Sequence, residues 1–387
     1  MKSFATPPRR AAKFLPLAAG LAILALTAGC SGIRLDTLLR PNENDWQLAG
    51  GSERRLNFTP VPVTPPLTAE WEYDASAGFG PSAMAGKDSV LFIGTLQGEL
   101  QAVSLAKGDR LGWISLGSAI PGAPIVDGNN VIVVTSDERD NVISCDLRTG
   151  KKNWVRSAGP TDNAPLRSGE LIIVTTATGD VTAFDKDLGD ERWRFHAGRA
   201  IHGAPAGDGE RIYFGCDDGR LRALDRFGKL LWTSPGAGPF LAGPVVEDSL
   251  VIAGSFDRHV YAFDARTGKL VWKTRVPAVP YGSVAVAGNR AVIGTSGEEV
   301  VCFDTHTGSI LWSFHTGGVV TAAPLITGTI VYAPCLDKRL YAIDLGSGAL
   351  LWKLEYPSRL RTTPVPWGRD LLVPTEERVV YYMKGSK

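Results

Sequence analysis

The sequence has almost no net charge and few of the residues that mark common functional sites. Its 41 Lys and Arg residues balance 40 Asp and Glu residues, and no basic run occurs, so it shows no electrostatic footprint for nucleic acid. No pair among its five histidines has metal-ligand spacing, and neither a Gly-x-Ser-x-Gly motif nor a phosphate loop is present. The sequence therefore nominates no catalytic residue, no metal ligand and no cofactor site.

Beyond residue 30 the chain also lacks a sustained 3.6-residue apolar period, which predicts essentially no helix there. Its one long apolar run, Phe14 to Ala28, is short for a bilayer span and follows a basic stretch. That run ends in Leu26-Thr27-Ala28-Gly29-Cys30, so residues 1–29 are predicted to be a signal peptide.

The small residues directly before Cys30 resemble a bacterial lipobox. This resemblance implies cleavage before Cys30 and lipidation of its thiol and amine, although Thr27 stands where Leu is usual. An ordinary signal peptide or an uncleaved anchor is the alternative. Ser31 after the cysteine favours the periplasmic side of an outer membrane, if the cell has two membranes.

What the chain does contain is a repeat of about forty residues from Leu67 onward. Its most regular copy runs from Ala262 to Trp272 and reads AFDARTGKLVW. Spacings of 42, 41, 39, 39, 40, 40 and 40 residues separate its tryptophans, which are Trp71, Trp113, Trp154, Trp193, Trp232, Trp272, Trp312 and Trp352. Each unit also holds a β-branched run. Seven units carry a proline in phase with the tryptophans, and Ser283 fills the remaining slot; the prolines are Pro81, Pro124, Pro165, Pro205, Pro244, Pro324 and Pro364. The third strand ends in Asp in six units, at Asp146, Asp185, Asp225, Asp264, Asp304 and Asp344. Four short strands per unit with a Trp signature predict a propeller blade.

The repeated turn has a physical logic. An Asp that ends the third strand, such as Asp264, can accept hydrogen bonds from the turn amides downstream. Gly268 follows four residues later, where a positive φ is expected. Trp272 then lies on the outer strand, where its ring can pack against the neighbouring blade. The eight tryptophans are therefore predicted to dock blade on blade, and the Asp residues to be scaffold.

Counting the units predicts how the ring closes. Eight Trp-bearing strands are present, but the last unit, Arg361 to Met383, stops without a turn or a Trp strand. The strand Leu67 to Tyr73 has no blade before it and fits that vacancy. We therefore expect an all-β, eight-bladed propeller over residues 67–387, with four-stranded antiparallel blades and the last blade closed by the N-terminal strand.

The pattern Ala-x-Asp-x-x-Thr-Gly-x-x-x-Trp resembles the quinoprotein-type repeat. Two groups carry it: dehydrogenases that bind pyrroloquinoline quinone, and cofactor-free propeller lipoproteins of the BamB family, which assemble outer-membrane β-barrel proteins. The dehydrogenases hold their quinone against a disulfide of adjacent cysteines, and no Cys-Cys occurs here. The BamB family fits better in length, blade count and lack of insertions.

Residues 30–66 are predicted to be a lipidated cysteine and a Pro-rich tether. Within them, Asp45-Trp46, Gly50-Gly51 and Arg54 resemble the short opening segment of such propellers, the alternative being a linker with one chance tryptophan. Cys145, Cys216, Cys302 and Cys335 fall in repeats that are not neighbours and are expected to be buried apolar residues.

In the BamB family, loops leading into two successive blades contact the partner. By blade count they correspond to Arg199-Ala200-Ile201-His202 and Pro239-Phe240-Leu241-Ala242, where the family's leucines and Asp pair are absent. The candidate partner-binding residues are Arg199, Ile201, Phe240, Leu241, Tyr281 and Leu360. With Ile120 and Val320, the apolar ones among them either ring one mouth of the channel or tuck under the loops as blade core.

The predicted function is a non-enzymatic, lipid-anchored scaffold for protein–protein interaction, resembling the BamB role in outer-membrane protein assembly. Its partners would be protein components of that machinery, with no nucleic acid, and it would be a monomer within a complex. The alternatives are a quinone-dependent or degenerate redox propeller and a propeller that binds sugars or peptides.

Overall fold

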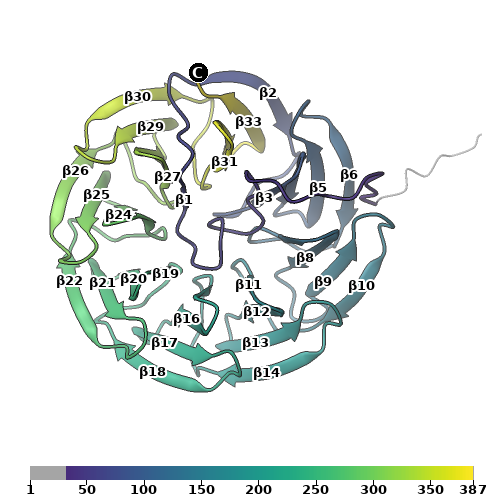
Figure 1. The fold of residues 1–387 in the computed structure, drawn as a ribbon, viewed down its shortest axis with the longest axis horizontal. Helices are drawn as coiled ribbons and strands as arrows, with labels where there is room; N and C mark the ends of the chain where they lie inside the picture. The colour runs from purple at the N-terminus through teal and green to yellow at the C-terminus, as the bar shows by residue number, and fades with distance from the viewer. Residues whose placement is uncertain (1–31, 387) are drawn as a thin grey trace, which may run out of the picture. The chain divides into compact units, whose positions relative to one another are not determined.

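Each repeat folds as one blade, with its first strand nearest a central axis and its Trp-bearing strand outermost (Figure 1). The computed structural model describes residues 32–386, so the predicted signal peptide and Cys30 lie outside the described residues. Eight four-stranded blades stack around the axis, and one gains a fifth strand. No helix within residues 32–386 is long and apolar enough to cross a membrane.

The strands follow one pattern from blade to blade. In chain order they are β1 (Phe58–Thr59) and β2 (Thr68–Asp74); β3 (Met84–Lys87), β4 (Val90–Gly94), β5 (Glu99–Ser104) and β6 (Arg110–Ser115) in blade 1; β7 (Ile125–Asp127), β8 (Asn130–Val134), β9 (Val142–Asp146) and β10 (Lys152–Arg156) in blade 2; β11 (Leu166–Ser168), β12 (Leu171–Thr175), β13 (Asp180–Asp185) and β14 (Glu191–His196) in blade 3; β15 (Ala206–Gly207), β16 (Arg211–Gly215), β17 (Arg220–Asp225) and β18 (Leu230–Pro235) in blade 4; β19 (Val245–Glu247), β20 (Leu250–Ser255), β21 (His259–Asp264) and β22 (Leu270–Arg275) in blade 5; β23 (Ala285–Ala287), β24 (Arg290–Gly294), β25 (Glu299–Asp304) and β26 (Ile310–His315) in blade 6; β27 (Leu325–Thr327), β28 (Ile330–Pro334), β29 (Arg339–Asp344) and β30 (Leu350–Glu355) in blade 7; and β31 (Val365–Trp367), β32 (Asp370–Pro374) and β33 (Val379–Lys384) in blade 8.

The N-terminal strand closes the ring, as the strand count predicts. β2 pairs antiparallel with β33, with Trp71 opposite Tyr382, and so supplies the outer strand of blade 8. The aromatic side chains of Trp71 and Tyr382 stack with their centroids 5.0 Å apart. The fold prediction is therefore confirmed, down to the way the two ends of the chain meet.

The repeated turn also forms as its residues predict. The Asp264 carboxylate accepts hydrogen bonds from the Thr267 amide (2.7 Å) and hydroxyl (2.6 Å). These bonds lower the pKa of Asp264, because they stabilise the ionised carboxylate. Gly268 has a φ of 71°, the left-handed conformation that glycine adopts without strain.

Six tryptophans clasp the next blade by one shared geometry. Each indole Nε1 donates a hydrogen bond to a backbone carbonyl of the next blade, that of the residue directly after the Asp position of the repeated turn. For Trp232, Trp272 and Trp312 this residue lies 33 positions further along the chain. The same ring lies against the turn glycine of the next blade: a Cβ on Gly268 would come 2.6 Å from the Trp232 ring. The six are Trp71, Trp154, Trp193, Trp232, Trp272 and Trp312.

Trp113 and Trp352 make no such bond within residues 32–386. Trp352 still packs against a core cluster that includes residues of blade 8, so the predicted packing fails at Trp113 and the hydrogen bond is missing at both. The blade 1 turn is one residue longer, which places Gly112 opposite Ala102, whereas Trp272 stands opposite Ala262 in blade 5. Trp113 is thereby shifted one position and faces the other way. Trp352 faces blade 8, whose third and fourth strands come from opposite ends of the chain and share no turn.

The clasp predicts that the turn glycine cannot take a side chain. Gly268→Ala should lower the free energy of unfolding by about 2–4 kcal/mol, because the new Cβ meets the Trp232 ring at a positive φ. Gly288→Ala is the matched control: φ is 55° there and nothing lies within 4 Å, so only about 1–2 kcal/mol should be lost. Chemical denaturation measures both, and equal losses would contradict the clasp.

Candidate functional site

The segment before the first blade strand lies along the axis, so the prediction of a separate tether is wrong. Trp46 is 6% exposed, and β1 pairs in parallel with β27. Amides of inner strands in six blades donate to its carbonyls: Gly86 to Trp46, Val126 to Gln47, Gly207 to Glu53, Val246 to Arg54, Val286 to Leu56 and Ile326 to Asn57. We call residues 46–59 the axial segment. It satisfies the inner-strand amides that a bare ring would leave unpaired at its centre.

Arg55 connects the axial segment to blades 3 and 4. The side chain is 3% exposed, and its guanidinium donates to four carbonyls: Ala49 (3.2 Å), Ala164 (3.2 Å), Pro165 (2.9 Å) and Pro205 (2.5 Å). Burial lowers the pKa of Arg55 to about 9, so the group remains charged at neutral pH. None of the ion pairs within residues 32–386 includes it. Arg55 is therefore a buried cation held by neutral carbonyl oxygens.

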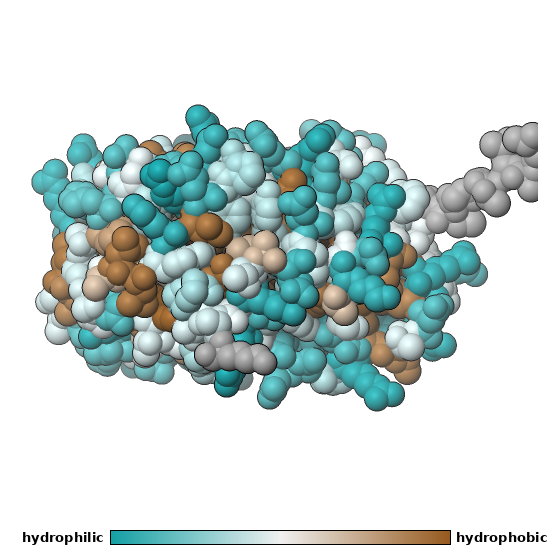
Figure 2. Space-filling model, turned by 90° about the horizontal axis from the view of Figure 1, so that it is seen from above, coloured by the Kyte–Doolittle hydropathy of each residue, from teal (hydrophilic) through white to brown (hydrophobic). Residues whose placement is uncertain are grey.

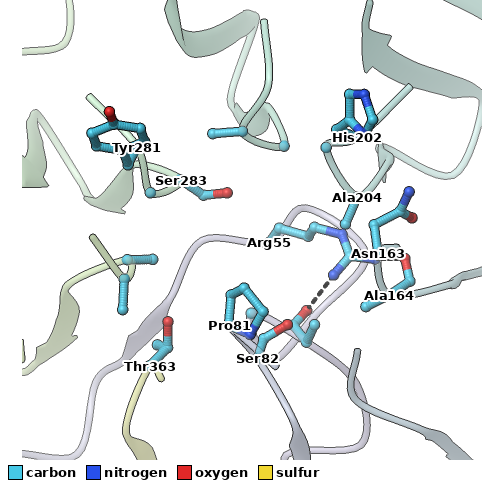
Figure 3. A pocket seen from close by; sticks show the side chains of 18 of the residues that line it. Arg55, Pro81, Ser82, Asn163, Ala164, His202, Ala204, Tyr281, Ser283 and Thr363 are labelled. Atoms are coloured by element: carbon cyan, nitrogen blue, oxygen red, sulfur yellow. Dashed lines mark hydrogen bonds between the residues drawn. The ribbon is translucent and has the colours of Figure 1, made fainter. Parts of the chain in front are cut away.

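A cavity of about 170 Å³ lies at the axis above Arg55 and Asn57 (Figure 3). Its walls come from the loops that lead into the inner strands, including Asp162, His202 and Tyr281. Figure 3 shows Arg55 extending from the axial segment toward Asn163 and Ala164, with His202 and Tyr281 on separate loops. The propeller thus has a mouth whose floor is part of its own chain.

The predicted partner-binding residues divide into a buried set and a surface set. Five apolar side chains are fully buried: Ile120, Ile201, Phe240, Val320 and Leu360. For three of them the reason is a glycine that ends the second strand of the preceding blade, because a Cβ on Gly94, Gly215 or Gly294 would overlap Ile120, Phe240 or Val320 respectively. The blade-core interpretation therefore applies, and Ile201, Phe240 and Leu360 present no side chain to a partner.

Three predicted residues keep an accessible side chain, and two of them, Leu241 and Tyr281, line the mouth. Arg199 is exposed, Leu241 is half-buried, and the Tyr281 side chain is 46% exposed. The Tyr281 ring packs edge-on against Phe256 at a centroid distance of 5.3 Å. Their three loops lead into blades 4, 5 and 6, so these residues lie on successive blades.

His202 bridges two carboxylates at the mouth, a contact that sequence reasoning missed. Its Nδ1 lies 2.5 Å from Asp162 and its Nε2 3.4 Å from Asp217. Burial by itself lowers the pKa of His202, but hydrogen bonding and the charges of Asp162 and Asp217 outweigh it and raise that pKa. Arg55 was missed too, because it stands beside Arg54 in a segment that carries no repeat.

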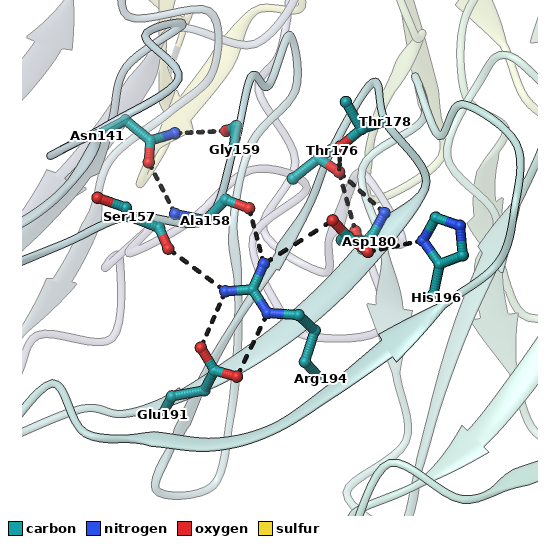
Figure 4. A network of polar contacts seen from close by, with 10 residues as sticks. All are labelled: Asn141, Ser157, Ala158, Gly159, Thr176, Thr178, Asp180, Glu191, Arg194 and His196. Carbon is teal, nitrogen blue, oxygen red and sulfur yellow. Dashed lines mark hydrogen bonds and ion pairs between the residues drawn. The ribbon is translucent and has the colours of Figure 1, made fainter.

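A polar network holds the mouth loops of blades 3 and 4 in place (Figure 4). Arg194 on β14 donates to the carbonyls of Ser157 and Ala158 in the preceding loop and to Glu191 on its own strand. Asp180 accepts from His196 at 2.8 Å, near the start of the loop that carries Arg199. Arg194 therefore joins blade 3 to the loop that follows β10 of blade 2. Its hydrogen bonds are directional and so fix the position of that loop more closely than an apolar contact would.

The residues at the axis do not fit pyrroloquinoline quinone, the cofactor of the dehydrogenases that share this type of repeat. Binding sites for molecules of that size occupy roughly 300–1,000 Å³, whereas the axial cavity is about 170 Å³ and its floor is Arg55. No group of three His, Cys, Asp or Glu residues within 32–386 could hold a metal ion. The four described cysteines are buried and unpaired, and burial raises the pKa of Cys145 to about 11. Because burial raises the pKa of all four thiols, they are protonated at neutral pH and supply no thiolate.

The side wall of the propeller offers a different kind of surface. Apolar residues gather at mid-height on the wall seen in Figure 2, between hydrophilic rims. Exposed aliphatic pairs stand directly before the outer-strand tryptophan in four consecutive blades: Leu230 and Leu231, Leu270 and Val271, Ile310 and Leu311, and Leu350 and Leu351. Phe227, 74% exposed, lies beside a pocket between blades 3 and 4.

Comparison with known proteins finds one family across the ring. The profile described as "Outer membrane protein assembly factor BamB" matches residues 68–178, 156–241, 177–281 and 257–382. The protein of that name from Burkholderia pseudomallei is 30% identical over 117 residues, which is 30% of this chain and 31% of that protein. The chain thus aligns with about a third of that relative's length.

Two solved structures share the fold. BamB from Moraxella catarrhalis superposes with a TM-score of 0.70 at 21% identity, covering 82% of this chain and 99% of that one. Quinohemoprotein alcohol dehydrogenase from Comamonas testosteroni gives a TM-score of 0.78 at 13% identity, covering 89% and 81%. At such identities these likenesses show the fold alone.

The axial segment predicts a large effect at Arg55 and a small one at its neighbour. Arg55→Met should lower the free energy of unfolding by about 3–5 kcal/mol, because four carbonyls lose a buried donor. Arg54 is exposed and its side chain makes no hydrogen bond within residues 32–386, so Arg54→Met should be nearly neutral. Urea denaturation of both variants checks the contrast, and a neutral Arg55→Met would refute the assigned role.

His202 predicts a pH-dependent stability. Its pKa is raised in the folded protein, so its contribution is complete below the unfolded value of about 6.5 and is lost as the pH rises through the folded value. The denaturation midpoint should therefore fall above pH 6.5, and His202→Gln should flatten that fall. His315→Gln is the comparison variant: its side chain is 79% exposed and lies 3.3 Å from Glu299, and the loss of such an exposed pair should cost little stability.

Proposed function

The chain belongs to the BamB family of outer-membrane protein assembly factors, and we propose that it is a non-enzymatic scaffold in the assembly of outer-membrane β-barrel proteins. The observation that carries this proposal is the family match from residue 68 to residue 382, which includes all eight blades. The geometry agrees with binding by surface complementarity, because the axial segment closes the bottom of the mouth and leaves only a shallow surface for contact.

We place the partner contact at the mouth, on Arg199, Leu241 and Tyr281. Tyrosine and arginine anchors are enriched at protein interfaces, and here they stand on loops fixed by the blades beneath them. The family's Asp pair is absent from the loop that carries Leu241. The contact in this protein therefore depends on residues of its own, and the partner surface should differ correspondingly.

Anchoring at Cys30 belongs to the same proposal. Lipidation of that residue would hold the propeller at the periplasmic side of the outer membrane, where a barrel-assembly partner lies. The aligned share of the curated relatives is too small to carry their complete role to this chain. Partner recovery is consequently the direct test of the assembly function.

Affinity capture from detergent-solubilised membranes tests the role and the face together. The protein should recover a barrel-assembly component, and the pair Arg199→Ser with Tyr281→Ser should reduce recovery by about fivefold or more, as the loss of interface anchors does. Arg226→Ser with Phe227→Ser is the matched control, because it also removes one exposed arginine and one exposed aromatic, in a turn of blade 4.

Two outcomes would count against the proposal. If no barrel-assembly component is captured by the unaltered protein, the assembly role fails. If capture succeeds but the two pairs of substitutions reduce it equally, the role stands and the mouth is the wrong face.

A further inference from the structure

The junction between blades 1 and 2 is closed by the beginning of the described chain in place of an indole. The shifted register puts Gly112 at the docking position, where a Cβ would meet the Gly32 carbonyl oxygen at 2.8 Å. The Leu147 carbonyl, equivalent to the acceptor of each docking tryptophan, accepts from the Leu35 amide at 2.7 Å. Ile33 is fully buried between the two blades.

The turn glycine of blade 2 shows the same replacement. Gly150 corresponds to Gly268, yet the atoms nearest to its built Cβ are the Ile33 carbonyl oxygen at 3.1 Å and Arg34 Cγ at 3.3 Å. Residues 32–35 thus occupy both halves of the clasp, the glycine contact and the carbonyl bond. The chain is held at the outer rim here and runs inward from it to the axis (Figure 1).

The contact of residues 32–35 with blades 1 and 2 limits which part of the propeller can face a membrane to which Cys30 is anchored. Cys30 stands two residues before Gly32 in the sequence. If Cys30 is lipidated, which is part of the proposed function, the rim around residues 32–35 must lie within a few residues' reach of the lipid. A free tether of 37 residues would have imposed no such limit.

The rim at this junction is basic. Six exposed cationic side chains lie on residues 32–35 and on the turns and outer strands of blades 1 and 2: Arg34, Lys107, Arg110, Arg148, Lys151 and Lys152. None of the six takes part in an ion pair within residues 32–386, whereas cations of the next junctions, such as Arg156, Lys186 and Arg192, are paired. We call these six residues the junction surface.

The surrounding side chains neutralise little of that charge, although the Arg110 guanidinium lies over the Trp113 ring at 4.4 Å from its centroid. Asp36 and Asp109 are exposed nearby, and the Asp146 carboxylate accepts from Arg148 and Thr149 amides in the turn, so cations outnumber carboxylates six to three. Leu38 is 52% exposed and Leu111 is 45% exposed beside them. Cations interspersed with exposed aliphatic side chains match a surface of anionic lipid headgroups.

We propose that the junction surface binds anionic phospholipid headgroups and so orients the propeller on the membrane that anchors it. The basic residues contact the headgroup phosphates, and Leu38 and Leu111 lie at the level of the upper acyl chains. The mouth residues Arg199, Leu241 and Tyr281 belong to blades 4 to 6, away from this junction, and stay free for a protein partner.

Vesicle co-sedimentation tests the proposal with the chain that begins at Ser31, since residues 32–386 contain the closed ring and its core. This chain should bind vesicles of mixed phosphatidylglycerol and phosphatidylcholine, and not vesicles of phosphatidylcholine alone. Neutralising three cations, Arg148→Gln, Lys151→Gln and Lys152→Gln, should weaken the binding about tenfold or more.

A matched control exists in the repeat itself. Arg266 and Lys269 of blade 5 are the repeat equivalents of Arg148 and Lys151, and Lys273 adds a third exposed cation. Arg266→Gln, Lys269→Gln and Lys273→Gln change the net charge equally and should alter binding by less than about twofold. Unchanged thermal midpoints would show that both triple variants fold.

Two results would overturn the proposal: no preference of the starting chain for phosphatidylglycerol, or an equal loss in both triple variants. The second would show that overall charge, and no particular surface, drives the binding. Neither result depends on capture of a barrel-assembly component, so the lipid contact and the scaffold role can fail separately.

Discussion

The clasp between one blade's tryptophan and the next blade's turn is the contact on which the ring depends. A single blade buries too little apolar surface to stand alone, so stability comes from contacts between neighbours. The indole supplies both parts of that contact: its face covers the turn glycine, and its Nε1 pairs with a carbonyl that would otherwise be buried without a donor. Because the same pair recurs at six junctions, the blade spacing can vary little.

A second constraint comes from the centre of the ring. The innermost strands have no neighbour on the axial side, so their amides need partners from elsewhere. Residues 46–59 provide these partners in six blades, and Arg55 adds contacts to blade 3. The same segment that completes the inner strands also floors the mouth, so the stability of the ring and the depth of the cavity are set by one stretch of chain. A cofactor at the axis would have to displace that stretch.

The two ends of this leading chain serve different surfaces. Residues 32–35 replace a tryptophan at the rim of blades 1 and 2, where unpaired cations gather. Residues 46–59 lie at the axis beneath the mouth loops of blades 4 to 6. The proposed lipid contact and the proposed protein contact therefore lie on different blades of one ring.

The sequence by itself determined the blades, because each depends on local chemistry repeated at a constant spacing. The Asp turn, the positive-φ glycine, the outer tryptophan and the count that closes the ring at Trp71 and Tyr382 were all predictable. The proline series marked the inner strands. Six of its prolines, from Pro124 onward, stand directly before their strands, where no ladder amide is needed, whereas Pro81 stands three residues before β3.

Only the tertiary structure decided the contacts of residues that have no counterpart in the repeat. The roles of Arg55, Ile33 and Leu35 depend on chain segments more than a hundred residues away, which no spacing reveals. The burial of Ile201, Phe240 and Leu360 was likewise open, because the sequence of a loop does not show whether its apolar side chain faces a partner or packs into the core of its own blade. Trp113 shows the limit most plainly: one inserted residue turned a docking side chain to the other face, and residues 32–35 filled its place.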